Sequence, residues 1–306
     1  MSRYLIVRIG QSLLAIWGIV TIVFVVTRML GDPAVLLLPL GTPDSQIQEL
    51  RNSLGLERPM IVQYLDFLRH AAVGDFGQSY QYFRPAMGVV LERLPATATL
   101  TACALLLGSI LGAVTGFAAA LARGRFIEFP IMCLALVGQA TPVFWLGILL
   151  ILFFAVGLGW FPTGGWDGPA SLVLPTVALG IFVAANITRL FRSSMIETLS
   201  EDYIRTARAK GLTPGTIFSV HAARNALIPV VTMLALLAAE LLGGSAVTET
   251  VFSWPGVGRL LVQAIDSKDF PVIQAGVFVI ATIFVGINLL VDLLYTLLDP
   301  RIRLGR

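Results

Sequence analysis

The sequence predicts an all-α integral membrane protein with six transmembrane helices. Of the 306 residues, 57% are hydrophobic and only 13% are charged, whereas soluble domains carry roughly 25% charged residues. The mean hydropathy is +0.85. Several apolar stretches are also long enough to cross a bilayer, which takes about 20 residues. These observations argue against a cytosolic enzyme, a secreted domain and a nucleic-acid-binding protein.

Six apolar windows account for this composition. They cover residues 5–29, 96–121, 131–158, 171–191, 227–247 and 272–298. Small residues recur within them at four-residue spacing, as in Gly108, Gly112 and Gly116, and small residues let helix backbones approach closely in a membrane. We therefore expect the spans to pack against one another.

The windows divide the chain into four parts. These are an N-terminal part with the first span (1–29), an extracytoplasmic segment (30–95), a core with the other five spans (96–298) and a tail (299–306). The first window is too long for the apolar region of a signal peptide, which has about 7–15 residues. We expect it to be an uncleaved membrane anchor.

The positions of lysine and arginine predict that both termini face the cytoplasm. With that orientation, the short outer loops hold only Arg259 and Lys268. The inner parts hold Arg3, Arg8, Arg123, Arg125, Arg189, Arg192, Arg205, Arg208, Lys210, Arg224, Arg301, Arg303 and Arg306. This is the positive-inside pattern of a multi-pass protein. The net charge of +3 thus reflects membrane topology, and we expect no nucleic-acid partner.

The two cysteines are expected to be buried structural thiols. Cys103 lies in the second window and Cys133 in the third. Neither belongs to a CxxC or histidine-rich pattern, so neither a disulfide nor a metal site is predicted.

The extracytoplasmic segment is predicted to form a small helical cap. Apolar residues recur at helical spacing over residues 47–54, and Pro59 is expected to begin a second helix. A glycine-rich stretch over residues 74–80 predicts a turn or a short extended element. Two interpretations of the cap remain open, a structural lid and a surface that contacts cargo or a docking partner.

The cytoplasmic segment over residues 192–224 is predicted to contain two short helices. Ser200 is the expected N-cap of a helix over residues 201–210, which Gly211 ends. Thr213 is expected to cap a second helix that runs toward the fifth window. An ordinary charged loop remains the alternative. Loops of this length in compact proteins tend to be functional, however, and we favour a protrusion that docks a partner.

Motifs along the chain resemble those of a known family. They are EDYIRTARAKG at 201–211, His221 with RNALIP at 224–229, GDP at 31–33, LGL at 54–56, GDFG at 74–77, VFSWPGVG at 251–258, PVIQ at 271–274 and DPRIR at 299–303. They are similar to motifs of ABC importer permeases of the dipeptide, oligopeptide and nickel type. The long outer segment and the tail resemble the first of the two permeases in such systems, the B-type subunit.

The resemblance implies a transport subunit in the bacterial inner membrane, without catalytic residues and without a cofactor of its own. Its implied partners are a second permease, two ATP-binding subunits that use ATP and Mg²⁺, an extracytoplasmic solute-binding protein and membrane lipid. The residues implied to couple to the ATPase are Arg205, Thr206, Ala207, Arg208, Ala209, Lys210, Gly211 and Leu212. Consistently, the sequence has no GxxxxGK[ST] phosphate-binding loop.

Cargo is implied only as a class. Arg205-Thr206-Ala207 stands where permeases generally carry Glu-Ala-Ala, and Pro229 lies farther from Gly211 than in sugar-type permeases. Both departures resemble the peptide branch, so di- or oligopeptides are the expected cargo and maltose-like cargo is not. Nickel, metal chelates and glutathione-like thiols are the alternative.

Polar residues inside the spans are candidates for the cargo path, because polar groups are costly in lipid. Glu240 in the fifth window is a candidate to meet a cationic group of the cargo, and a hydrogen bond between helices is the alternative. Gln139 and Asn186 either line the path or brace a kink. Asp292, near the cytoplasmic end of the last window, is expected to be structural.

Two other classes of membrane protein fit the sequence less well. A stand-alone secondary carrier usually has an internal repeat and midplane carboxylates, whereas no repeat is evident and intramembrane charges are few. An intramembrane hydrolase is disfavoured because HExxH and GxSxG motifs are absent.

Overall fold

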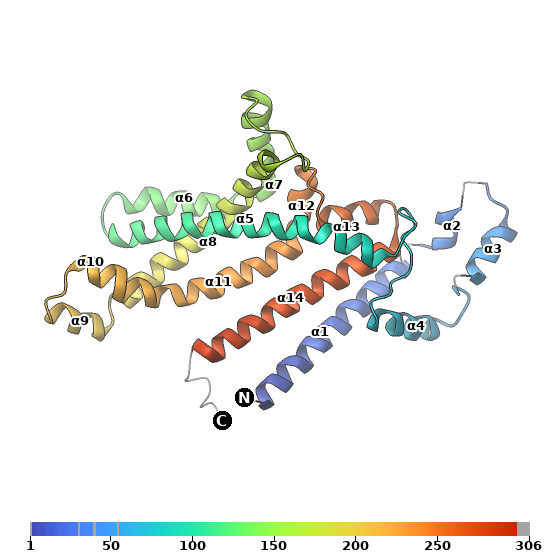
Figure 1. Ribbon diagram of the computed structural model, residues 1–306, viewed down its shortest axis with the longest axis horizontal. Helices are drawn as coiled ribbons and strands as arrows, with labels where there is room; N and C mark the ends of the chain where they lie inside the picture. The colour runs from blue at the N-terminus through green and yellow to red at the C-terminus, as the bar shows by residue number, and fades with distance from the viewer. Residues whose placement is uncertain (1, 30, 39–40, 54, 299–306) are drawn as a thin grey trace. The chain divides into compact units, whose positions relative to one another are not determined.

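The computed structural model describes residues 2–29, 31–38, 41–53 and 55–298 (Figure 1). It is helical and forms two compact units, Met1–Thr97 with Pro255–Arg306, and Ala98–Trp254. The predicted tail at 299–306, with its DPRIR motif, and Leu54 of the LGL motif lie outside the described residues.

In the first unit, α1 (Ser2–Met29) and α14 (Phe270–Leu298) pack side by side and antiparallel (Figure 1). Arg8 Nη2 lies 3.3 Å from Asp292 Oδ1 at one end of the pair. At the other end, Gln274 Nε2 donates a hydrogen bond to Thr27 Oγ1 at 3.0 Å. Asp292 therefore joins two helices, as expected of a structural residue.

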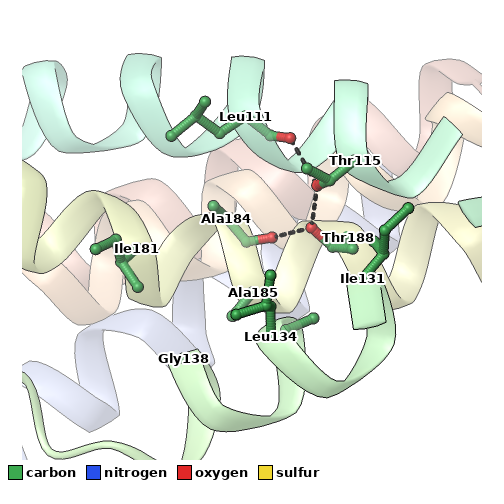
Figure 2. Close-up of a pocket in the computed structure, with 10 residues that line it drawn as sticks. Leu111, Thr115, Ile131, Leu134, Gly138, Ile181, Ala184, Ala185 and Thr188 are labelled. Atoms are coloured by element: carbon green, nitrogen blue, oxygen red, sulfur yellow. Dashed lines mark hydrogen bonds between the residues drawn. The ribbon is translucent and has the colours of Figure 1, made fainter. Parts of the chain in front are cut away.

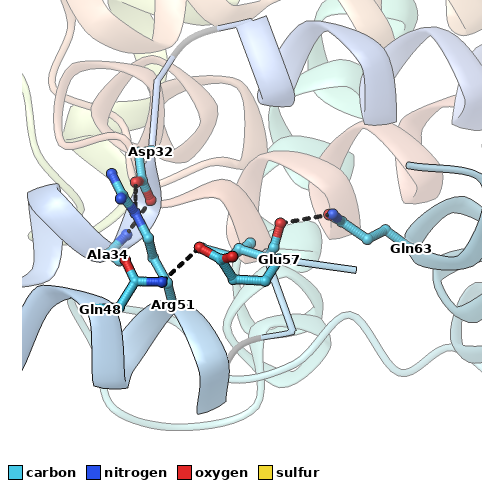
Figure 3. A network of polar contacts seen from close by, with 7 residues as sticks. Asp32, Ala34, Gln48, Arg51, Glu57 and Gln63 are labelled. Atoms are coloured by element: carbon cyan, nitrogen blue, oxygen red, sulfur yellow. Dashed lines mark hydrogen bonds and ion pairs between the residues drawn. The ribbon is translucent and has the colours of Figure 1, made fainter. Parts of the chain in front are cut away.

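The segment that was predicted to be extracytoplasmic forms the expected helical cap, here called the outer cap. Its helices are α2 (Pro33–Leu37), α3 (Asp44–Ser53) and α4 (Met60–Ala72). The last two were predicted, and α2 was not. Asp32 caps α2 by accepting the Ala34 N–H at 2.9 Å, and its other oxygen accepts Arg51 Nε at 2.5 Å (Figure 3). These bonds join α2 to α3.

A chain of aromatic rings fixes the cap to the membrane helices of the same unit. Phe24 on α1 stacks on Phe67 of α4, with ring centroids 5.2 Å apart. Phe67 contacts Phe76 at 6.2 Å, and Phe76 contacts Phe278 of α14 at 5.2 Å. Such contacts add to the hydrophobic burial of the rings. The glycine-rich turn around Phe76 is therefore part of the core, which also includes α13 (Val257–Asp266).

The helix α5 (Ala86–Leu121) begins ten residues before the predicted window, which started at residue 96. The window excluded the charged Glu92, but Arg84 pairs with this side chain through two bonds of 2.8 and 2.7 Å. The helix also continues through Pro95, which removes one backbone N–H without ending it. The predicted extracytoplasmic segment thus includes the first turns of α5.

In the second unit, α8 (Pro169–Thr198) is the central helix. Against it pack α6 (Glu128–Ala140), α7 (Val143–Leu150) and α11 (Ala223–Gly244). The glycines of α5 also face it. A Cβ on Gly112 would lie 2.6 Å from the Cβ of Ile187, and one on Gly116 would lie 2.8 Å from the Thr188 carbonyl oxygen. The expected close approach of the spans is therefore confirmed here.

The third predicted span, residues 131–158, is not one continuous helix. It consists of α6 and of α7 continued by the π-helix η1 (Ile151–Gly157), and the two parts are bent by 101°. Thr141 at the break is extended, with φ −76° and ψ 124°, because a residue before proline is driven out of the helical region. Within the described residues, five helices are long and apolar enough to span a membrane, and this bent pair makes a sixth.

The remaining helices lie at the two ends of the second unit. Near one end are α9 (Asp202–Ala209) and α10 (Pro214–Thr216), and near the other are α7 and α12 (Ala246–Val251) (Figure 1). The helix α10 continues through the π-helix η2 (Ile217–Ala222) into α11. The second short helix predicted in the cytoplasmic segment is thus the first part of the fifth span.

Candidate functional site

The predicted docking helix exists and is anchored by its apolar face. In α9, Ile204 is 0% exposed and Ala207 is 6% exposed. The two residues are three apart and so share one face of the helix. This helix packs against η2, where Ile217 and Ala222 are buried. We call residues 201–222 the protrusion.

The predicted N-cap of α9 was wrong, and that of α10 is confirmed. Ser200 Oγ donates to the Glu197 carbonyl at 2.6 Å, and Glu201 occupies the N-cap position of α9 without a capping bond from its side chain. The cause is the length of α8, which runs to Thr198 and places Ser200 in its closing turn. Thr213 accepts the Thr216 N–H at 3.4 Å, as expected.

Gly211 ends α9 as predicted. Its φ is +76°, a left-handed conformation that glycine adopts without the steric cost of a Cβ. Its N–H donates to the Arg208 carbonyl at 2.9 Å, and the Leu212 N–H donates to the Ala207 carbonyl at 3.3 Å. No atom lies within 4 Å of a Cβ built on Gly211, so backbone conformation and not space requires glycine here.

The solvent-exposed face of the protrusion is polar and basic. Its exposed residues include Arg205, Thr206, Arg208, Ala209, Lys210 and Leu212. Arg205 pairs with Asp202 at 3.2 Å. At the base, Asn225 Nδ2 donates to the Tyr203 hydroxyl at 2.7 Å and so ties α9 to α11. The protrusion thus combines a fixed base with an exposed cationic face, which suits the docking of a protein partner.

The structure brings together two of the three polar residues predicted in the spans. Gln139 Nε2 on α6 donates to Asn186 Oδ1 on α8 at 3.1 Å, and Asn186 Nδ2 donates to the Phe182 carbonyl at 2.9 Å. Arg189 in turn bonds Gln139 Oε1. Asn186 is 8% exposed. This geometry favours the bracing alternative, because the amides join α6 to α8.

Glu240 takes no part in the hydrogen bond between Gln139 and Asn186. It is exposed on α11, and no hydrogen bond or ion pair of its carboxylate is found within the described part of the chain. A carboxylate in a span that has no partner among the described residues is available to a partner subunit or to cargo.

A groove of about 220 Å³ lies between α5, α6 and α8 (Figure 2). The hydroxyls of Thr115 and Thr188 lie 2.6 Å apart in it. Each also bonds a carbonyl of its own helix at 2.7 Å, those of Leu111 and Ala184. The hydroxyls are therefore satisfied, and the groove presents mainly aliphatic groups.

Two buried carboxylates were missed by the sequence analysis. Glu249 in α12 is 0% exposed and accepts the Ser245 hydroxyl at 2.9 Å, but α12 itself was not predicted. Asp269 is 1% exposed and directly precedes α14. An aspartate directly before an apolar stretch is a typical signal for the start of a helix, so the sequence did contain a sign that could have identified Asp269. Burial, together with the charge of Asp269, raises the pKa of Tyr80.

Models of two protein families match this chain. The model described as "Binding-protein-dependent transport system inner membrane component" matches residues 83–304. The model of the N-terminal part of such membrane components matches residues 1–101. Together these matches extend over both units.

Relatives match along nearly the whole chain. The di/tripeptide transport system permease protein DppB of Pseudomonas aeruginosa (strain UCBPP-PA14) is 37% identical over 99% of both chains. A putative peptide transport system permease protein of Brucella abortus (strain 2308) is 38% identical over 99% of both. The glutathione transport system permease protein GsiC of Salmonella typhimurium (strain LT2) is 41% identical, again over 99% of both.

Solved structures show the same fold. The MetNI methionine ABC transporter in an inward facing conformation gives a TM-score of 0.56 at 19% identity, over 70% of this chain and 97% of that chain. An amino acid ABC transporter gives 0.50 at 21% identity, over 70% and 94%. This chain therefore belongs to the binding-protein-dependent transport system inner membrane components, the permeases of ABC importers, as its motifs predicted.

Proposed function

We propose that this chain is the B-type permease of an ATP-driven importer that carries di- or oligopeptides across the bacterial inner membrane. The observation that supports this proposal is its 37% identity to the di/tripeptide permease of Pseudomonas aeruginosa over 99% of both chains. Because the alignment covers 99% of both chains, it includes the outer segment and the protrusion as well as the spans. We place both termini in the cytoplasm.

The protrusion is the proposed contact with an ATP-binding subunit. Residues 205–212 present their basic face outward, while Ile204 and Ala207 hold the helix on η2. A short helix fixed in this way moves as a rigid piece with the fifth span. ATP and Mg²⁺ are used by two such partner subunits, a second permease completes the pore, and a solute-binding protein delivers cargo. We expect this chain to hold no cofactor of its own.

Glu240 is the proposed cargo-path residue. Its exposed carboxylate on α11 suits the ammonium group of a peptide. For Gln139 and Asn186 we propose a bracing role in place of direct cargo contact, because their hydrogen bonds join α6 to α8.

Glutathione is the second candidate cargo. The relative from Salmonella typhimurium named for glutathione transport is 41% identical, and glutathione is itself a tripeptide. No comparable observation favours nickel or metal chelates.

Affinity purification of the tagged chain from its native membrane, followed by mass spectrometry, tests the subunit assignment. We expect a second permease and ATP-binding subunits to copurify. Recovery of the chain alone would overturn the assignment and favour a stand-alone carrier. Uptake of a labelled peptide by the recovered complex in proteoliposomes, with unlabelled peptides and glutathione as competitors, then identifies the cargo class.

A further inference from the structure

A cavity of about 580 Å³ lies in the first unit, next to the outer cap. Residues of α1, α3, α4 and α14 line it, together with the glycine-rich turn. A neighbouring cavity of about 220 Å³ shares Arg28, Phe76, Gly77 and Gln274 with it. Sites for small molecules commonly have volumes of about 300–1,000 Å³, so the space is sufficient for a short peptide.

Arg28 supplies a positive charge to both cavities. It lies in the last turn of α1, half-buried, with its guanidinium carbon 5.5 Å from the centre of the Phe24 ring. The nearby Asp32 is engaged by Arg51 and by the Ala34 N–H. No hydrogen bond or ion pair of Arg28 is found within the described ranges. A half-buried guanidinium of this kind is suited to a carboxylate, which it binds through two parallel bonds.

Gln63 lines the cavity, and its amide holds the segment before α4. Its Nε2 donates to the Leu56 carbonyl at 2.9 Å (Figure 3) and to the Arg58 carbonyl at 2.7 Å. Reversing the amide would place its oxygen against both carbonyls, so the orientation is determined by these contacts. Gln63 Oε1 is buried and has no partner among the described residues. Because this oxygen is closed to solvent, it is not among the groups that face a ligand in the cavity.

The acidic groups of the cavity complete a pattern of mixed charge. Asp66 is paired with Arg58 at 3.1 Å. Asp75 uses one carboxylate oxygen, Oδ1, to accept the Gly77 N–H at 2.9 Å. His70 Nδ1 bonds the Asp66 carbonyl at 2.8 Å. The groups still available are therefore the guanidinium of Arg28 and the second oxygen of Asp75, which together suit a ligand that carries both charges.

We propose that this cavity binds a short peptide in its zwitterionic form. The carboxylate of the peptide pairs with Arg28, and its ammonium group pairs with Asp75. The inference rests on the proposed function, because it takes peptides as the cargo. It adds a peptide site on the outer cap, separate in sequence and in unit from Glu240.

Equilibrium dialysis tests the site directly. The probe is labelled dialanine, offered to the purified permease–ATPase complex without the solute-binding protein, and its C-terminal amide is the matched ligand. We expect at least tenfold weaker binding for the amide, and a similar loss for dialanine in Arg28→Gln. Arg69→Gln is the control, since Arg69 is exposed on α4 and does not line the cavity. Equal binding of acid and amide, or unchanged binding in Arg28→Gln, overturns the proposal.

A second measurement leaves Arg28 in place, in case its replacement disturbs folding. Ser53 lines the cavity, and Ser53→Cys provides a thiol for labelling whose modification is read site by site with mass spectrometry. We expect dialanine to slow labelling at residue 53 and leave that of Cys103 unchanged. Equal labelling rates with and without dialanine contradict the site.

Uptake separates this inference from the proposed function. If the wild-type complex with its binding protein imports dialanine while Arg28→Gln binds dialanine unchanged, the cavity site is wrong and the peptide importer stands. If the wild-type complex imports no peptide, the proposed function fails, whatever the dialysis result.

Discussion

The Asp269 carboxylate accepts a hydrogen bond from the Ser79 hydroxyl at 2.5 Å, although the two residues are 190 positions apart in the sequence. The same carboxylate accepts the backbone N–H groups of Tyr80 and Gln81, each at 3.2 Å. A single buried side chain at the start of α14 therefore holds the turn that follows the outer cap.

Asp269→Ala is expected to loosen that turn. The change leaves the two backbone N–H groups without their acceptor, and each such loss costs about 1–3 kcal/mol when the group stays buried. Limited proteolysis of the purified complex should show faster cleavage within residues 76–85. Asp266→Ala is the control because Asp266 is exposed on α13. Identical cleavage rates for the two variants would contradict the assigned role of Asp269.

Gly211→Pro is expected to separate ATP hydrolysis from transport. Proline holds φ near −65° and has no N–H, whereas Gly211 has φ +76° and donates to the Arg208 carbonyl. The end of α9 must therefore rearrange. The ratio of peptide uptake to ATP hydrolysis in proteoliposomes should fall at least tenfold. Gly88→Ala, which lies outside the protrusion and places a Cβ in open space, should keep the wild-type ratio. Normal coupled uptake by Gly211→Pro would refute the coupling role.

Ile204→Ala is expected to weaken docking of the ATP-binding subunits. Truncating a buried isoleucine costs about 2–5 kcal/mol, and this one holds α9 on η2. The yield of ATP-binding subunit per tagged permease should fall. Ile61→Ala, at an exposed position of α4 outside the protrusion, provides the comparison. Equal yields from both variants would show that the buried face of α9 does not support docking.

Glu240→Gln is expected to lower peptide uptake without lowering assembly of the complex. The substitution keeps the size of the side chain and removes the charge proposed to meet the peptide ammonium group. Initial uptake rates and subunit stoichiometry are the two measurements. Glu49→Gln, on the exposed face of α3, serves as the control. Unchanged uptake would exclude Glu240 from the cargo path.

Gly112→Ala is expected to destabilise the second unit. The added Cβ would lie 2.6 Å from the Cβ of Ile187, and overpacking of this kind costs about 1–3 kcal/mol. The melting temperature of the complex in detergent should fall. Gly88→Ala in the same helix has open space around it and should leave the melting temperature equal or higher. An equal or higher melting temperature for Gly112→Ala would mean that α5 and α8 can move apart at little cost in stability.

Local sequence patterns predicted most helices because their causes are local. The α3 and α4 helices were recognised from apolar spacing and from glycine or proline at their ends, and α9 was recognised from the glycine that ends it. Gly211 is an example, since its left-handed φ is determined by the turn itself. The Thr213 cap was predicted for the same reason, because its bond spans three residues.

Features that depend on distant residues were not predictable in this way. Ser200 fits the pattern of an N-cap, but it lies in the closing turn of α8 because α8 extends to Thr198. The partner of Gln139 is Asn186, 47 positions away. The break at Thr141 was obscured because the average hydropathy of the window stays high on both sides of Pro142, although the proline itself was a visible signal.

The break in the third span constrains how the nascent chain is inserted into the membrane. The helix α6 has 13 residues, about 20 Å at 1.5 Å per residue, whereas the hydrocarbon core is about 30 Å thick. Backbone freed at Pro142 must also be shielded from lipid. Since α6 and α7 both pack on α8, the nascent segment gains its shelter only after α8 has been synthesised. A polypeptide truncated before Pro169 is therefore expected to be a substrate for membrane quality control.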